Sequence, residues 1–489
     1  MAHTSDPSRF LSHRLATWAA GLRYEDLPAS TVHAAKRFWL DSLACAIGGS
    51  RTHDAQILLD HYRAMSAGSH GPCTTLVSGF HTNPVDAAFL NSHLVRAMDF
   101  NDIYWQADPC HPSDLICAPL ALCELRNLSG QDLILATAIV YELQCRFAEI
   151  GRPGIREYGW HHATLSGFAS GLACARVLGL TPSQATHAVG ISAARSGTLG
   201  AVTAGELTMM KNTVDPWAAR LGAESALLAE RGFTGPAHII DGKEGLFHTL
   251  ALADGTRSFD AHALTADLPT SQSDPWRIER VSMKSFPVEA LMHTPLTALM
   301  AIRTRTTLDP ARVREIRVEV IARAADILGD PAKYRPTTRE TADHSLPYAM
   351  AVGLVDGQIG PDQFDESRVQ DPALHPVMDA VRVVPNTEFE SRFPASQPSR
   401  VTVTLDTGET YSEHAEYPKG DPRHPMTDAE IESKLRMLCA GTLSEAQADR
   451  LIEVVGELEH ALSVEPLLRA THSEPEHNHS HADAATVGV

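Results

Sequence analysis

The sequence predicts a mainly α protein, in which a large all-helical domain is built from N- and C-terminal parts and a smaller α+β domain is inserted between them. Apolar residues at helical spacing, with capping signals, run from about residue 10 to residue 265. Residues 314–321 instead alternate between apolar and polar side chains, as a strand does. Capping boxes at Thr427 and Ser444 indicate that helices resume near the C-terminus. The expected boundaries are 1–275 and 419–470 for the helical domain, 276–418 for the α+β domain and 471–489 for a disordered His-rich tail.

Start and stop signals divide the first helical part. Gly48 and Gly49 predict the end of a helix that begins near residue 29, and Pro84 predicts the start of another. Thr181 begins a capping box that Gln184 completes. Further helices are predicted for residues 115–125 and 132–147 and from Asp215-Pro216 onward. Small residues crowd these segments, so we expect a bundle of closely packed helices.

The inserted section mixes both patterns. Residues 381–384 are a second short strand candidate, and residues 401–405 and 409–413 flank Thr407-Gly408 as the arms of a hairpin do. Helical spacing in residues 293–303 and 344–355 makes this section α+β rather than all-β.

Composition excludes several classes of protein. Sixty acidic residues against 41 basic ones give the 489-residue chain a formal charge of −19, which argues against nucleic acid and anionic membranes as partners. No apolar run is long enough to span a membrane, and the N-terminus lacks the layout of a secretory signal. The eight cysteines have no CxxC spacing and several lie in apolar helical stretches. We therefore expect buried thiols in a cytoplasmic protein, without an iron–sulfur or structural zinc site.

Familiar nucleotide-binding and hydrolase motifs are missing, but polar residues interrupt the apolar helices in one segment. There is no P-loop, GxGxxG, GxSxG or HExxH. Residues 98–114 carry Asp99, Asp102, His111 and Ser113 between two apolar helices. Pro112-Ser113 resembles a helix entry, which would place His111 near a helix N-terminus, where anions bind. A polar loop with a capping side chain is the alternative interpretation.

Three further groups of polar residues are weaker signals taken singly. His161 and His162 precede a predicted helix, although an interface loop has the same pattern. Lys211 is a lone base ahead of a capped helix, and most such lysines lie on the surface. Lys284 and His293 flank an apolar stretch at the predicted domain change, and domain junctions are preferred ligand sites.

In this order along the chain, the motifs DFND…HPSD, GWHH, a lysine before DPWAAR, KSFP…H and DHSLPYAMA resemble the MmgE/PrpD family. The resemblance extends from about residue 10 to residue 465. The family includes 2-methylcitrate dehydratases, cis-aconitate decarboxylases and an iminodisuccinate epimerase. The resemblance implies a helical domain with an inserted α+β lid, a cytoplasmic homodimer, and no metal or organic cofactor.

The resemblance also implies a set of site residues. The expected catalytic residues are Asp99, His111, His161, Lys211 and Lys284, and the expected substrate-binding residues are Asp102, Ser113, His162, His293 and His344. Our hypothesis is that His111 and Asp99 form a hydrogen-bonded acid/base pair and that His161 is a second proton-transfer group. The two lysines would hold substrate carboxylates, because a tricarboxylate carries about three negative charges near neutral pH.

The expected function is a cofactor-independent hydro-lyase, a lyase that dehydrates 2-methylcitrate, and also citrate, to 2-methyl-cis-aconitate, as in propionate catabolism. The decarboxylases tend to have DFDD and a shorter gap to HPS, whereas His111 lies twelve positions after Asp99 here. They also carry a lid tyrosine, and Tyr334 is the only tyrosine between the first predicted strand and the DHS motif.

Three alternatives remain open. A cis-aconitate decarboxylase forming itaconate would use the same pocket. An epimerase or racemase of a dicarboxylate such as iminodisuccinate would need two bases on opposite faces, which His111 and His161 could supply. A non-catalytic metal-binding scaffold would use His472, His477, His479 and His481.

Overall fold

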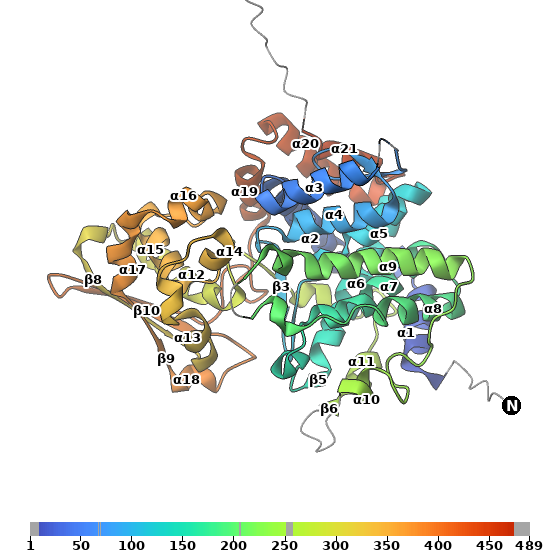
Figure 1. Cartoon of the computed structure of the whole chain (residues 1–489), viewed down its shortest axis with the longest axis horizontal. Coiled ribbons are helices and arrows are strands. Elements are labelled where there is room, and N and C mark those ends of the chain that lie inside the picture. The colour runs from blue at the N-terminus through green and yellow to red at the C-terminus, as the bar shows by residue number, and fades with distance from the viewer. Residues whose placement is uncertain (1–8, 67, 69, 205–206, 251–257, 474–489) are drawn as a thin grey trace, which may run out of the picture.

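The computed structural model describes residues 9–66, 68, 70–204, 207–250 and 258–473 (Figure 1). The described chain is mainly helical, as predicted. The helices of the N-terminal half are α1 (Leu11–Gly21), α2 (Ala29–Gly49), α3 (His53–Ser66), α4 (Pro84–Arg96), α5 (Cys117–Arg126), α6 (Gly130–Glu149), α7 (Ala163–Val177), α8 (Pro182–Ala193), α9 (Val214–Glu230), α10 (Leu246–Leu250) and α11 (Ala261–Thr265). The C-terminal helices are α19 (Asp428–Cys439), α20 (Glu445–Gly456) and α21 (Glu465–Ala470).

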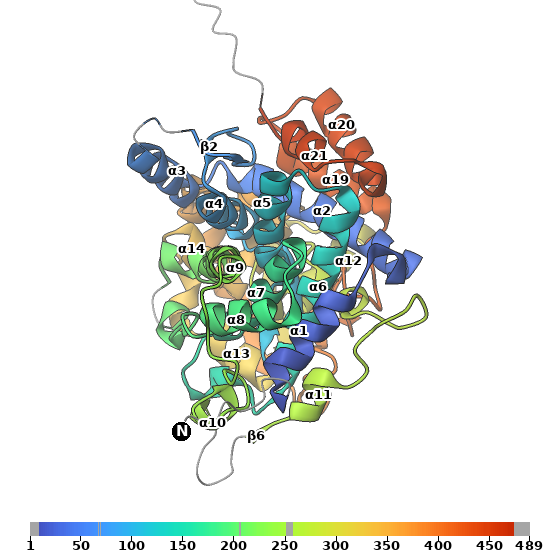
Figure 2. The ribbon, with the colours of Figure 1, turned by 90° about the vertical axis from the view of Figure 1, so that its right-hand side faces the viewer.

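The larger of two main hydrophobic cores joins these helices across a long gap in the sequence. Its buried residues run from Leu11 to Met283 and then from Met426 to Leu468. The C-terminal helices, red in Figure 2, lie against the N-terminal helices, and α19 packs on α2. Lys434 of α19 fixes this contact, because its Nζ is buried 2.7 Å from Asp41 Oδ1 of α2. The first core continues through Met283, beyond the boundary expected at residue 275.

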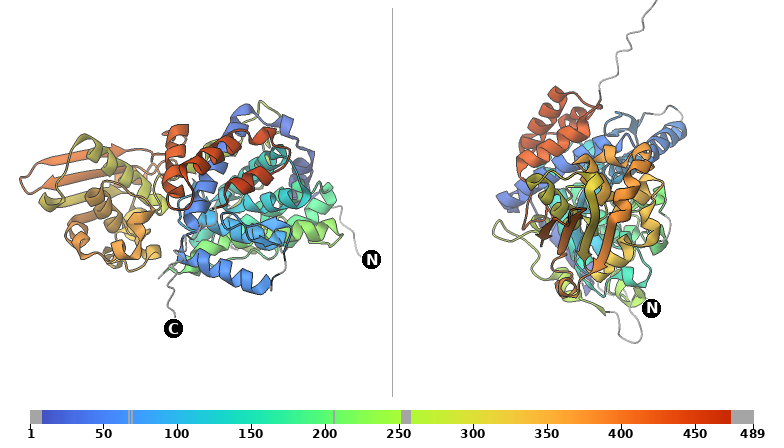
Figure 3. Two further views of the ribbon diagram at one scale, coloured as in Figure 1. Left: turned by 90° about the horizontal axis from the view of Figure 1, so that it is seen from above. Right: turned by 90° about the vertical axis from the view of Figure 1, so that its left-hand side faces the viewer.

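The second of these cores is formed by residues between Val288 and Ala415 and makes the separate lobe on the left of Figure 3. It contains a four-stranded sheet in the order β11-β10-β8-β9, with β8 (Val313–Val320), β9 (Val381–Pro385), β10 (Ser399–Leu405) and β11 (Thr410–Ala415). β10 pairs antiparallel with β8 and β11, whereas β9 runs parallel to β8. The accompanying helices are α12 (His293–Arg305), α13 (Ala322–Leu328), α14 (Arg339–Ala342), α15 (Leu346–Asp356), α16 (Glu366–Val369), α17 (His375–Ala380) and α18 (Thr387–Glu390).

Short strands bring distant loops together beside the first core. β3 (Asp102–Trp105) pairs with β4 (Pro109–Cys110) and with β7 (Ser282–Met283), so the loop after α4 lies next to the segment that enters the second core. The other small strands are β1 (Cys73–Thr74), β2 (His81–Thr82), β5 (Gly151–Arg152) and β6 (Ser258–Phe259). The pairing of β3 with β7 brings residue 102 to within reach of residue 284.

One sequence-based expectation about helix ends is confirmed, and one about the tail needs correction. The Gly48-Gly49 pair is expected to end a helix, and α2 ends at Gly49. These glycines also allow close packing, since a Cβ on Gly49 would clash with the carbonyl oxygen of Leu94 in α4. The tail was expected to be disordered from residue 471, but Thr471 is fully buried and Ser473 N donates to Val77 O at 3.2 Å. Residues 474–489 lie outside the described residues.

Other expectations are confirmed. All eight cysteines are buried as free thiols. The capping boxes at Thr181, Thr427 and Ser444 each begin the predicted helix. None of the described helices combines the length and hydropathy that crossing a membrane requires.

Candidate active site

Asp99 lies at the centre of the candidate site, shortly after α4 ends. Its backbone has a φ of 50°, in the left-handed region that aspartate tolerates better than most residues other than glycine. Burial alone would raise the pKa of Asp99, but three neighbouring cations hold this pKa well below its ordinary value. These cations are Arg96, Lys211 and Lys284. Asp99 is therefore ionised at neutral pH and serves as their common counter-ion.

Each of the two predicted lysines contacts a different oxygen of the Asp99 carboxylate. Lys284 Nζ lies 2.5 Å from Asp99 Oδ1, and Lys211 Nζ lies 3.1 Å from Asp99 Oδ2. Lys284 also donates to the carbonyl oxygens of Asp99 and Val288, at 3.0 Å each. Burial is the main cause of the lowered pKa of Lys284. Both ammonium groups are thus held in fixed positions inside the protein.

Asp343 extends the network toward the second core. Lys211 Nζ lies 3.1 Å from Asp343 Oδ2 and 3.4 Å from the Nδ1 of His344. His344 also contacts the Asp343 carboxylate directly. These contacts place the DHS motif beside the lysine that precedes α9, although the two lie more than 130 residues apart.

Three buried histidines form a row next to this network. The ring centroids of His111 and His162 are 5.6 Å apart, and those of His162 and His161 are 3.9 Å apart. Burial lowers the pKa of His111 and of His161 well below the ordinary value, and neighbouring positive charges lower both further. Both rings are therefore neutral at pH 7.

Hydrogen bonds fix opposite tautomers in two of these rings. His111 Nδ1 lies 2.6 Å from the carbonyl oxygen of Asp102, which can only accept, so the proton is on Nδ1. Its Nε2 makes no hydrogen bond with any described residue and is free to accept a proton. His161 Nδ1 instead accepts from the backbone N–H of Ala163 at 3.2 Å, so its proton is on Nε2. The row therefore presents one basic nitrogen and one N–H donor.

The predicted pairing of His111 with Asp99 is wrong. Among the described residues, His111 hydrogen-bonds the Asp102 carbonyl instead. The Asp99 carboxylate is paired with neighbouring cations such as Arg96. The Asp102 carboxylate accepts from Ser113 N at 3.1 Å and from Ser113 Oγ at 2.7 Å. Burial raises the pKa of Asp102 to about 7 in spite of these bonds. Asp102 and Ser113, expected to bind substrate, thus hold the loop that orients His111.

The two remaining predicted histidines have different neighbours. His162 Nε2 lies 3.1 Å from Asp215 Oδ2, and both side chains are buried. His293 Nε2 lies 3.3 Å from Val288 O, the same carbonyl that accepts from Lys284. Burial, followed by the Lys284 charge, lowers the pKa of His293 to about 3. Every predicted site residue therefore belongs to one connected, largely buried cluster.

Comparison with known proteins assigns this arrangement to a family. Models of the MmgE/PrpD N-terminal and C-terminal domains match residues 13–257 and 286–460. The chain belongs to the MmgE/PrpD family. A cis-aconitate decarboxylase-like protein, oryM, from Aspergillus oryzae is 26% identical, with 95% of this chain and 98% of the relative covered. A cis-aconitate decarboxylase from Aspergillus terreus is 25% identical, with 94% and 95% covered. A 2-methylcitrate dehydratase from Cupriavidus necator is 25% identical, with 82% and 84% covered.

Sequence reasoning missed three charged residues in this MmgE/PrpD site. Arg96 ends α4 and contacts both Asp99 and Asp114, Asp215 pairs with His162, and Asp343 pairs with Lys211. Asp215 and Asp343 lie within motifs that carried the family resemblance, but the first was interpreted as a helix start. Arg96 had no local signal, because a basic residue in a last helical turn is ordinary.

Two groups of buried residues in this site offer suitably spaced metal ligands. His161, His162 and Asp215 form one group, and Asp99, Asp343 and His344 form the other, with ligand atoms within 4.8 Å of one another in each. In both groups ligands are already paired: His162 pairs with Asp215, and Asp99 and Asp343 pair with Lys211 outside their group. The donor sets fit a divalent cation in type, but a cation in the second group would compete with Lys211.

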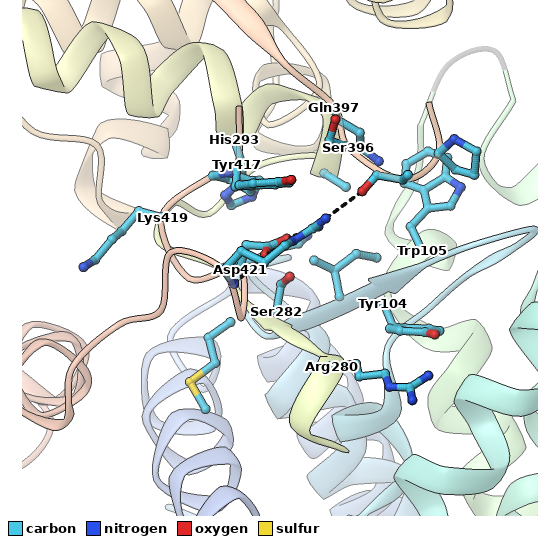
Figure 4. Close-up of a pocket in the computed structure, with 18 of the residues that line it drawn as sticks. Tyr104, Trp105, Arg280, Ser282, His293, Ser396, Gln397, Tyr417, Lys419 and Asp421 are labelled. Atoms are coloured by element: carbon cyan, nitrogen blue, oxygen red, sulfur yellow. Dashed lines mark hydrogen bonds and ion pairs between the residues drawn. The ribbon is translucent and has the colours of Figure 1, made fainter. Parts of the chain in front are cut away.

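A pocket opens between the two cores, beside the candidate active site (Figure 4). Of the predicted site residues, Lys284 and His293 line it. The labelled side chains of Trp105, Ser396, Gln397 and Tyr417 surround it in Figure 4. The pocket therefore reaches the cluster at Lys284.

Proposed function

We propose that this protein is a lyase that removes water from a small hydroxy-tricarboxylate, with 2-methylcitrate as the substrate and 2-methyl-cis-aconitate as the product. Citrate is proposed as a second substrate. The reaction is proposed to need neither a metal nor an organic cofactor. The observation that carries this proposal is the pair of opposite tautomers at His111 and His161 beside the Asp99 cation cluster.

The first step assigned to the site is proton removal from the carbon next to a carboxylate. His111 Nε2 is the base, because burial keeps the ring neutral and the Asp102 carbonyl keeps the proton on Nδ1. Since negative charge builds up on the neighbouring carboxylate as the proton leaves, cations at fixed positions stabilise the transition state. Lys211 supplies this charge in the proposed mechanism.

The second step is departure of the hydroxyl group. The electron pair of the broken C–H bond forms the C=C bond while the C–O bond breaks, and the oxygen leaves as water after receiving a proton. His161 Nε2–H orients the hydroxyl by hydrogen bonding. The Lys284 ammonium donates the proton, because burial lowers its pKa and makes it more acidic than an exposed lysine.

Decarboxylation of cis-aconitate to itaconate is the second candidate. Its support is that relatives named cis-aconitate decarboxylase match over nine-tenths or more of this chain. The position of Tyr334 favours dehydration instead, since its hydroxyl donates to Val381 O at 3.0 Å inside the second core. Epimerisation of a dicarboxylate such as iminodisuccinate is a third outcome that the same test covers.

A substrate panel distinguishes these reactions. Purified protein is given 2-methylcitrate stereoisomers, citrate, cis-aconitate and iminodisuccinate, each with and without chelator. We expect a conjugated alkene from 2-methylcitrate without release of carbon dioxide and without chelator sensitivity. Carbon dioxide from cis-aconitate would replace the proposal with decarboxylation, and a change in optical rotation alone would replace it with epimerisation.

We also propose that residues 276–418 act as a lid over the site and that the active form is a cytoplasmic homodimer. The contact between Lys211 and Asp343 supports the lid, because it joins the two sides of the site across the two cores. Exposed Met209, Met210 and Trp217 support an oligomer, since large apolar side chains cluster at interfaces. Light scattering measures the oligomeric state directly. The alternative metal-binding scaffold rests on His472, His477, His479 and His481, and the last three lie outside the described residues.

A further inference from the structure

Arg156 is a basic residue close to the histidine row that neither the motifs nor the mechanism has used. It lies in the short 3-10 helix Ile155–Tyr158, five positions before His161. The buried carboxylate of Asp108 holds the start of this helix, accepting from Ile155 N at 2.9 Å and from Arg156 N at 3.2 Å. The backbone at Arg156 is therefore fixed, and Asp108 is already occupied by it.

The guanidinium group of Arg156 has no counter-ion at contact distance within the part of the chain that the structure describes. Among the described residues it makes neither an ion pair nor a side-chain hydrogen bond, although it is only partly exposed. Burial and the charge of Arg323 lower the pKa of Arg156, while the charges of Glu289, Asp108 and Glu157 act in the opposite direction. Arginine stays charged under all these conditions. A partly buried charge without a partner is costly, so an anion that bound there would remove part of this cost.

A tryptophan provides a flat surface beneath this charge. The guanidinium carbon of Arg156 lies 5.6 Å from the centre of the Trp105 ring, and that of Arg323 lies 5.7 Å from the same ring. Arg323 belongs to α13 of the second core and is already paired with Glu157 at 2.8 Å. Of these two arginines, only Arg156 has side-chain donors that bond none of the described residues.

The same tryptophan connects Arg156 to the pocket between the cores. Trp105 lines that pocket together with Lys284 and His293 (Figure 4), and its ring packs edge-on against Phe393 of the second core. The Arg156 charge also contributes to the lowered pKa of His161. Arg156 thus lies near His161 and, through Trp105, near the pocket wall.

We propose that Arg156 binds one carboxylate of the substrate, stacked beside Trp105, and so distinguishes tricarboxylates from dicarboxylates. This inference rests on the proposed function of the site. Lys284 and Lys211 each contact the Asp99 carboxylate already, and Lys211 contacts Asp343 as well. A free guanidinium group suits the added carboxylate better, because it can donate two parallel hydrogen bonds to it.

The test measures binding without requiring turnover. Tricarballylate is a tricarboxylate without a hydroxyl group, so it cannot lose water, and glutarate is a dicarboxylate of the same chain length. Calorimetry with the full-length protein compares wild type, Arg156→Gln, Arg156→Lys and the control Arg195→Gln, whose side chain pairs with Glu224 on the surface. We expect Arg156→Gln to weaken tricarballylate roughly 10- to 100-fold, the loss of a charge-assisted hydrogen bond, and glutarate less than about 3-fold.

The variants and the two acids make each outcome decisive. The tricarballylate affinity of Arg156→Lys should fall between those of wild type and Arg156→Gln, since lysine keeps the charge but cannot donate two parallel hydrogen bonds. The affinity of Arg195→Gln should match that of wild type. Equal weakening of both acids, unchanged tricarballylate affinity, or no binding by wild type would overturn the inference. If Arg156-dependent binding is found without any turnover of tricarboxylates, the proposed function fails and the inference stands. If wild type and Arg156→Gln dehydrate 2-methylcitrate with the same KM, the inference fails and the function stands.

Discussion

His111 shows most directly how a single residue is prepared for chemistry. Its Nδ1 is committed to the Asp102 carbonyl and its Nε2 is unpartnered among the described residues. We expect His111→Gln to lower kcat roughly 10²- to 10⁴-fold, the usual contribution of a positioned base, because glutamine cannot accept the proton. Turnover of 2-methylcitrate and circular dichroism measure activity and folding together.

A matched control separates this effect from general damage. His187 of α8 also bonds a backbone carbonyl, Gly235 O, but it does not line the pocket. His187→Gln should keep kcat within about 3-fold of wild type, as surface-type substitutions do. Near-normal turnover by a correctly folded His111→Gln variant would remove His111 from the mechanism.

Asp99 is expected to contribute more to stability than His111 does, because its carboxylate is the counter-ion of three buried cations. Asp99→Asn leaves Arg96, Lys211 and Lys284 buried with less negative charge between them. We expect a loss of about 3–5 kcal/mol in the free energy of unfolding, typical for breaking a buried ion pair from one side. Urea denaturation at pH 7 measures it, with Asp60→Asn, an exposed surface position, as the control. A loss as small as the control's would contradict the counter-ion role.

At the scale of elements, the C-terminal segment after α21 supports a strained loop. Val77 has a φ of 65°, a conformation that a β-branched residue rarely adopts. Thr471 Oγ1 accepts from Val77 N at 3.4 Å, and Ser473 N donates to Val77 O at 3.2 Å. The residues just after the last helix therefore hold this loop in place.

Two truncations test that contact. Ending the chain after Ala470 removes Thr471 and Ser473, so we expect roughly 1–3 kcal/mol of stability to be lost, the cost of strained backbone that is no longer supported. Ending it after Ser473 keeps both contacts and should match full-length protein. Thermal unfolding measures the difference, and equal melting temperatures for the two truncations would contradict the inferred support.

Local patterns along the chain were enough to predict many elements but not the contacts between them. The strand from residue 313 and the boxes at Thr181 and Thr427 follow from spacing that is visible within a few residues. Gly48-Gly49 marks the end of α2 as predicted, but the close approach of Gly49 to α4 is a contact that this local pattern does not reveal. The site residues came from motif order, whereas Arg96 and the Asp102 carbonyl contact depend on how α4 and β3 pack, which no local pattern records.

At the scale of the whole molecule, buried titratable groups make stability depend on pH in two opposing ways. His111, His161 and His293 have lowered pKa values in the folded state, so the unfolded chain takes up protons first as pH falls below about 6.5. Their contribution is therefore lost on the acid side. Asp102 has a raised pKa, so its contribution is present at low pH and is lost as pH rises through about 7.

Asp102→Asn isolates the alkaline half of this balance. Asparagine does not titrate, so the variant lacks the stability that wild type gains by keeping Asp102 protonated at low pH. Between pH 8 and pH 5, we expect wild type to gain roughly 2–3 kcal/mol relative to the variant, from a shift of about three units between the unfolded and folded pKa. Hydrogen bonds that the asparagine amide cannot make lower the stability of the variant by the same amount at every pH. They therefore do not affect how the stability difference changes with pH. Urea unfolding at pH 5, 6, 7 and 8 gives the difference at each pH, and Asp60→Asn should run parallel to wild type throughout. A difference between wild type and Asp102→Asn that stays constant with pH would mean that Asp102 is ionised in the fold, and that the His111 loop is held by a charged carboxylate.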